Sequence, residues 1–185
     1  MGLLAVGLAL TPLAAGAKSE GPEHPTEAAA RARPLPMHQR ERELIDIFQT
    51  ARTAYLSRKP PKLSAKDARV GLQVGVIGFM QHGQTATDWV GQLISRRTTR
   101  EGAMRLEVQI APGIVIVTRQ SEVADGNEQT LLSRFSPLHD KAENAELGVP
   151  IIFSAQILES PLASDEEMIM RPKLIARFTD LKSAE

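Results

Sequence analysis

The chain has 185 residues, of which 42% are hydrophobic and 4% aromatic, and its 22 basic and 22 acidic side chains give a formal net charge of zero. This length suffices for one domain with an appendage, and the composition is that of an ordinary globular protein. Because the sequence contains no cysteine, disulfides within this chain and thiolate metal or redox sites are excluded.

The first segment, residues 2–17, carries no charged side chain and ends in Ala15-Gly16-Ala17, a small-x-small pattern that signal peptidase accepts. It is shorter than the roughly 20 residues that a membrane-spanning helix needs. We therefore expect residues 1–17 to be a signal peptide cleaved near Ala17, and the mature protein to be periplasmic or secreted. An uncleaved anchor and an apolar start without a role are the alternatives.

A tether and a helical arm are expected next. Residues 18–36 contain four prolines among Gly, Glu and Ala, a composition typical of a disordered tether. Residues 37–80 form the expected arm, whose first helix is predicted over 37–58 and ended by Pro60-Pro61. One apolar stripe at helical spacing supports this helix: Leu44, Phe48, Ala51 and Tyr55. The solvated side is expected to hold Arg40, Glu41, Glu43, Asp46 and Arg52.

The second part of the arm begins at Ser64-Ala65-Lys66-Asp67, which resembles a helix capping box with Asp in place of Glu. Residues 70–80 are apolar but contain three glycines, so a buried helix and a strand both remain open. Residues 31–69 hold 10 basic and 4 acidic side chains, whereas residues 70–185 hold 11 basic and 15 acidic ones. We expect the basic arm to pack against the acidic remainder; weak contact of residues 31–69 with an anionic membrane surface is the alternative.

From Thr85 onward the pattern predicts strands. Residues 104–110 alternate apolar and polar side chains, the period of a strand with one wet face. Pro112-Gly113 fits a tight turn, and a loop is expected over residues 160–167. Ser136-Pro137 predicts the start of a helix that runs to Glu146. The five predicted strands cover residues 89–94, 104–110, 114–117, 149–158 and 168–181.

The resulting order is three strands, a helix and two strands, which is the order of the OB-fold, a five-stranded barrel with a helix between strands 3 and 4. We therefore predict an α+β protein. An N-terminal helix, or two, is followed by a five-stranded antiparallel OB-like β-barrel over residues 85–182.

Four different short motifs lie within the predicted barrel: Asp88-Trp89-Val90-Gly91, Thr130-Leu131 before Ser136-Pro137, Ile151-Ile152-Phe153-Ser154, and Pro172 to Phe178. In these motifs the chain resembles small exported bacterial proteins of unknown function that have an N-terminal helical arm and an OB-like barrel. The resemblance covers about residues 85–182 and implies a fold and export, but no activity. This chain departs from that pattern at Ala155, where those proteins have glycine.

Motifs for catalysis and for metal binding are not found in the sequence. The four histidines are scattered, and only His139-Asp140 places one beside a carboxylate. Because neighbours along a chain point apart, we expect no metal site. Glu166-Glu167 suits an exposed acidic cluster better than a catalytic carboxylate pair. Without a nucleophile motif, a dinucleotide motif or a phosphate loop, we expect no enzyme and no cofactor.

The densest basic run is Arg96-Arg97-Thr98-Thr99-Arg100, which suits either a solvated hairpin tip or a contact for an anion. The candidate binding residues are Trp89, Arg96, Arg97 and Arg100, although Trp89 also suits the core. OB-barrels bind single strands on exposed aromatic side chains beside a basic groove. Few aromatics and the acidic barrel disfavour nucleic acid here.

These observations favour a non-enzymatic exported binding or interaction module for an unknown protein or small ligand of the cell envelope. Single-stranded nucleic-acid or anion binding through the barrel is one alternative. A periplasmic enzyme that carries no local motif is the other.

Overall fold

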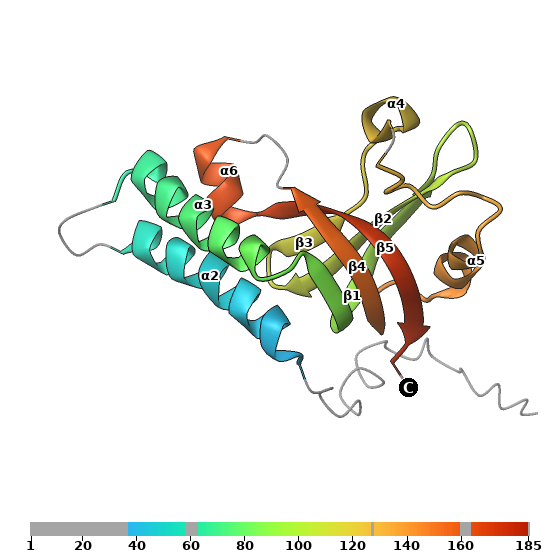
Figure 1. Cartoon of the computed structure of the whole chain (residues 1–185), viewed down its shortest axis with the longest axis horizontal. Helices are drawn as coiled ribbons and strands as arrows, with labels where there is room; N and C mark the ends of the chain where they lie inside the picture. Colours follow the sequence, from blue (N-terminus) through green and yellow to red (C-terminus); the bar gives the residue numbers. More distant parts are fainter. Residues whose placement is uncertain (1–36, 58–62, 127, 160–163, 185) are drawn as a thin grey trace, which may run out of the picture. The chain divides into compact units, whose positions relative to one another are not determined.

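Figure 1 shows a computed structural model of the chain, which describes residues 37–57, 63–126, 128–159 and 164–184. The predicted signal peptide and tether lie outside these residues, so export stays a prediction. Within the described ranges, no helix combines the length and apolar character needed to cross a bilayer.

The first described helix is α2 (Gln39–Leu56), which confirms the helix predicted over residues 37–58. His38 caps it, because its Nδ1 accepts a hydrogen bond from the backbone N–H of Arg40. The buried face of α2 joins the main core through Leu44, Ile45 and Phe48.

Glu41 corrects the expected solvated face of α2. Its side chain is fully buried, and Oε2 accepts a hydrogen bond from the N–H of Val90 at 3.2 Å. Its charge placed Glu41 on the expected solvated side, although it precedes Leu44 by three residues and Phe48 by seven and so shares their helix face. The strand that carries Val90 covers it.

Residues 70–80 are helical, because they belong to α3 (Ala65–Gln81). The capping signal at its start is confirmed: the Ser64 hydroxyl accepts a hydrogen bond from the N–H of Asp67 at 3.1 Å. The same hydroxyl donates to Oδ2 of Asp67 at 2.6 Å. This local hydrogen bonding satisfies an amide that would otherwise lack a partner in the first turn.

Packing explains why α3 tolerates three glycines. Leu72 and Phe79 are buried, and a Cβ at Gly75 would lie only 2.9 Å from the side chain of Ile47 on α2. Gly75 therefore permits close contact between the two helices. Burial of an apolar face outweighs the low helix propensity of glycine.

Five strands form a closed barrel in the order β1-β2-β3-β5-β4, with β4 also paired to β1 (Figure 1). Their bounds are Thr85–Thr98 for β1, Met104–Ala111 for β2, Ile114–Val117 for β3, Pro150–Glu159 for β4 and Lys173–Ser183 for β5. The predicted α+β architecture with a five-stranded barrel is confirmed.

The prediction of an antiparallel barrel is wrong at one pairing. β3 and β5 run parallel, with Val115 opposite Lys173 and Val117 opposite Ile175, whereas the other four pairings are antiparallel. The reason is geometric, because strand direction cannot alternate around a closed ring that has an odd number of strands. One parallel pair is required once five strands close.

Two short helices connect β3 to β4: α4 (Glu122–Asp125) and α5 (Pro137–Asn144). α5 confirms the helix predicted from Ser136-Pro137, since the Ser136 hydroxyl accepts a hydrogen bond from the N–H of His139 at 3.2 Å. α4 is a single short turn of four residues that follows β3.

A further helix, α6 (Asp165–Met170), lies between β4 and β5 and corrects both the predicted loop over 160–167 and the strand start at Met168. Ser164 caps it by accepting a hydrogen bond from the N–H of Glu167. Three acidic residues in its first turn complement the positive end of the helix dipole. β5 therefore begins only at Lys173.

The barrel interior is filled with side chains. On β2, alternate side chains are buried as the period of two predicts: Met104, Leu106, Val108 and Ile110. Trp89 is fully buried, with its ring edge-on to Phe79 and Phe153 at centroid distances of 6.3 and 6.4 Å. Because Phe79 belongs to α3, this aromatic cluster joins the arm to the barrel.

Arginines of the arm also bind the barrel side of the molecule. Arg52 on α2 donates hydrogen bonds to the carbonyl oxygens of Pro112 at 3.0 Å and Met170 at 2.8 Å. Arg69 on α3 pairs with Asp165 of α6 at 2.6 Å. These contacts agree with the expectation that the basic arm packs against the acidic remainder.

Candidate functional site

The predicted contact residues lie in different environments. Trp89 has no exposed surface, because it occupies an inward-facing position of β1 beneath Phe79 and Phe153. It therefore belongs to the core, and its place among the binding candidates is corrected.

Arg96 is half-buried and binds within the protein. Its Nη1 donates hydrogen bonds to the carbonyl oxygens of Ala142 at 2.9 Å and Ala145 at 2.6 Å, and also to that of Glu143. These oxygens lie at the C-terminal end of α5, where helix carbonyls lack intrahelical partners and a cation is favoured. Arg96 thus holds α5 against β1.

Arg97 and Arg100 remain candidates for a contact surface. Both are exposed, and within the described ranges no ion pair engages either side chain. Arg97 lies near the end of β1, and Arg100 lies in the hairpin that connects β1 to β2.

Beside this hairpin lies a groove of about 740 Å³, which we call the hairpin groove. Its lining residues come from the hairpin, from the connection between β3 and β4, and from β5: Glu101, Ala103, Asp125, Gly126, Gln129 to Ser136, Leu138, Arg177 and Phe178. A Cβ at Gly102 would lie 3.2 Å from Cδ of Arg134, so the hairpin tip closely approaches the groove.

An exposed aromatic side chain lines the hairpin groove. Phe135 is 81% exposed, and the guanidinium carbon of Arg134 lies 4.6 Å from the centroid of its ring. Sequence reasoning missed this pair. The signal that could have found it is an aromatic residue in a polar connection, outside any apolar period and directly before the helix cap Ser136.

A buried carboxylate fixes one wall of the hairpin groove. Oδ1 of Asp125 accepts hydrogen bonds from the N–H and the hydroxyl of Thr130 at 2.8 and 2.6 Å, and Oδ2 accepts one from the N–H of Leu131 at 3.3 Å. The Thr130 hydroxyl oxygen in turn accepts a hydrogen bond from the N–H of Arg119 at 2.8 Å. The network holds Gln129 at a φ of 52°, in the left-handed region.

Two further hollows lie along α3. One of about 750 Å³ is formed between α2 and α3, and one of about 500 Å³ is lined by residues of α3, β4 and α6, among others. α3 also exposes Val70, Val74 and Ile77 at helical spacing, with exposed fractions of 53%, 67% and 57%. Charged residues also line both hollows, but neither is lined by an exposed aromatic side chain as the hairpin groove is.

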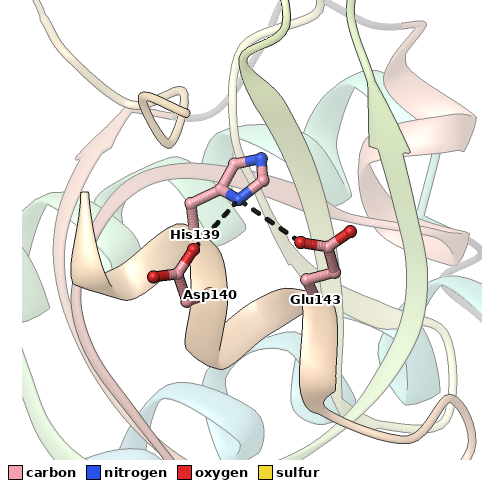
Figure 2. A group of neighbouring side chains, drawn as sticks. All are labelled: His139, Asp140 and Glu143. Carbon is pink, nitrogen blue, oxygen red and sulfur yellow. Dashed lines mark ion pairs between the residues drawn. The ribbon is translucent and has the colours of Figure 1, made fainter. Parts of the chain in front are cut away.

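α5 brings together three titratable side chains, a largely buried His139 and the exposed Asp140 and Glu143 (Figure 2). Nδ1 of His139 lies 3.8 Å from Oδ1 of Asp140 and 3.9 Å from Oε2 of Glu143. Although His139 and Asp140 are adjacent in sequence, their side chains do not point apart, because the Asp140 carboxylate turns back towards the ring.

Glu41 is the ionisable group most perturbed by its surroundings. Burial raises its pKa from 4.5 to about 7, and the backbone N–H groups of Val90 and His38 offset only part of this effect. It lies at the contact between α2 and β1 and is not among the residues that line the hairpin groove.

Comparison of the chain with models of protein families, with curated proteins and with solved structures finds no match. The function must therefore be argued from the fold and the groove themselves.

Proposed function

We propose that this protein is an exported, non-enzymatic binding module built on an OB-like barrel, and that its partner binds in the hairpin groove. The strand order β1-β2-β3-β5-β4 and the position of α5 between β3 and β4 support an OB-like topology. Barrels of that kind commonly bind ligands through the loop between strands 1 and 2. Here that loop supplies Glu101 and Ala103 to the groove.

The observation that carries this proposal is the Arg134–Phe135 pair. Burying a phenylalanine side chain stabilises a protein by about 1.5–3 kcal/mol. The ring of Phe135, which is 81% exposed, does not contribute this free energy to the fold. Aromatic and arginine side chains dominate binding energy in protein interfaces. The pair therefore suits a partner that covers the ring.

The charges around the groove further restrict the chemical class of the partner. Arg134 stacks on the ring, and the exposed Arg97 and Arg100 lie at the neighbouring hairpin. A partner with a negative charge next to a flat or apolar group matches this surface, as an acidic peptide or an acidic oligosaccharide of the cell envelope does. Single-stranded nucleic acid shares that chemistry and is kept as an outcome of the test.

Fluorescence anisotropy with three labelled probes tests the proposal: an acidic aromatic peptide, a sulfated oligosaccharide and oligo-dT. At low salt, where electrostatic contacts are strongest, we expect the peptide or the oligosaccharide to bind. The double variant R134Q/F135S should weaken that binding at least about tenfold, since losing about 1.4 kcal/mol suffices. Val123→Ser is the matched control, because Val123 is 94% exposed and does not line the groove.

Four results contradict the proposal. If no probe binds at low salt, or if R134Q/F135S binds as tightly as the wild type, the hairpin groove is not the binding surface. If oligo-dT binds best, with an affinity that falls steeply with salt, the nucleic-acid alternative replaces the proposal. Cleavage of a probe would favour the enzyme alternative.

Export is tested separately. Expressed from the full sequence in a bacterial host, the protein should be recovered from the periplasm or the medium with Lys18 as its N-terminal residue, because Ala15-Gly16-Ala17 fits signal peptidase. Intact-mass measurement reads this directly. Recovery of the soluble cytoplasmic protein with Met1 still present would contradict export without touching the groove proposal.

A further inference from the structure

α5 carries an imidazole whose nitrogens lack hydrogen-bond partners. The side chain of His139 is only 12% exposed, and both Nδ1 and Nε2 are buried without a hydrogen-bond partner among the described residues. Leaving a buried polar atom without a hydrogen bond is unfavourable. Such an atom calls for an explanation, and an unseen ligand is one of the few available.

Two carboxylates face the Nδ1 atom of this imidazole (Figure 2). Asp140 Oδ1 and Glu143 Oε2 lie 3.8 and 3.9 Å from it, which is too far for a hydrogen bond. One ligand atom from each of the three side chains lies within 4.8 Å of the other two. Ligand atoms about 2.0–2.2 Å from a shared ion lie about 3–4 Å apart, so small rotations of the exposed carboxylates complete such a set.

From this geometry we infer that His139, Asp140 and Glu143 form a binding site for a divalent transition-metal ion, with Zn²⁺ as the best match. Imidazole nitrogen together with carboxylate oxygen suits Zn²⁺, Ni²⁺ and Cu²⁺. Mg²⁺ and Ca²⁺ prefer ligand sets of oxygen alone, and Cu⁺ prefers sulfur.

The helix that bears these side chains is held at both ends. Ser136 caps its first turn, and Arg96 binds the carbonyl oxygens at its last turn. The i, i+4 spacing then keeps His139 and Glu143 on one face. A fixed backbone lowers the ordering cost of binding an ion.

Competition from a nearby cation is also reduced. Lys141, the basic residue of α5, pairs with Asp180 on β5 at 2.7 Å instead of with the two carboxylates. The carboxylates of Asp140 and Glu143 are 75% and 66% exposed, so an ion reaches them from solvent and keeps water in its remaining positions.

Calorimetric titration of the chelator-treated full chain with Zn²⁺ alone tests this site. We expect one ion bound per chain through these residues. Asp140→Asn and Glu143→Gln should each raise the Kd for Zn²⁺ at least about tenfold. Even residues that only hydrogen-bond to a metal ligand usually change metal affinity by about tenfold or more when they are replaced. His82→Ala is the matched control, because His82 is exposed on another helix end, where its Nδ1 contacts the carbonyl oxygen of Gly78.

A second readout separates binding from folding. Zn²⁺ should raise the Tm of the wild type and of His82→Ala, since a ligand of the folded state stabilises it. It should leave the Tm of Asp140→Asn and Glu143→Gln nearly unchanged. Because both carboxylates are exposed, these variants are expected to fold like the wild type without metal.

The inference is overturned if the wild type binds no Zn²⁺ at millimolar concentration. It is equally overturned if both carboxylate variants keep the wild-type Kd, or if His82→Ala loses binding as they do. None of these results bears on the hairpin groove, whose probes bind without metal.

Discussion

Replacing Glu41 with Gln should raise the free energy of unfolding by about 3 kcal/mol at pH 8 and leave it nearly unchanged at pH 4. The reason is that burial raises the pKa of this carboxyl from 4.5 to about 7 in the folded protein. Above pH 7 the folded wild type must hold a buried carboxylate, whereas Gln stays neutral.

The sign of the pH dependence follows from proton uptake. Between pH 4.5 and about 7 the folded state keeps a proton on Glu41 that the unfolded state releases. The wild type is therefore most stable at or below pH 4.5 with respect to this group, and loses stability as the pH rises to about 7. In that window the other carboxylates contribute equally to both proteins and cancel in the difference.

Urea unfolding at several pH values between 4 and 8 measures this effect. Glu43→Gln is the control, because Glu43 lies on the same helix but is exposed; its difference from the wild type should be small and independent of pH. A constant difference between wild type and Glu41→Gln across the range would show that Glu41 ionises normally. The contact of Oε2 with the N–H of Val90 would then outweigh burial.

Replacing Asp125 with Ala should lower the free energy of unfolding by about 3 kcal/mol. Asp125 is only 7% exposed and accepts three hydrogen bonds, two from Thr130 and one from Leu131. Truncation leaves two backbone N–H groups without their acceptor, and each such buried group costs about 1–3 kcal/mol.

Denaturant unfolding gives the total loss, and hydrogen exchange locates it. The amides of Thr130 and Leu131 should lose protection before the barrel strands do, because their acceptor has gone. Val123→Ala is the control from the same short helix, since Val123 is 94% exposed. Unchanged stability together with unchanged protection of both amides would refute the role of Asp125 in holding the groove wall.

Regular elements were the part of this protein that sequence reasoning recovered well. The alternation over residues 104–110, the stripe on α2 and the caps at Ser64 and Ser136 act over a few residues, so each is legible without knowledge of the fold. The number of strands followed from the same local patterns.

The functional surface was harder to predict because it combines segments that are distant in sequence. Arg96 was expected at a contact surface, but it binds carbonyl oxygens about 46 to 49 residues further along the chain. The hairpin groove joins three separate segments around Phe135. No periodicity within a short stretch of sequence indicates that such distant segments lie together.

What the sequence determined by itself is thus the number of strands, the helices α2 and α5, and the caps at Ser64 and Ser136, since short-range sterics and apolar periodicity control them. Ring closure decided that β3 and β5 run parallel, and packing of β1 on α2 decided that Glu41 is buried. The structure also turned Asp140 and Glu143 towards His139. The strand pairing and the burial of Glu41 depend on contacts between distant residues, whose energies exist only once the chain has folded.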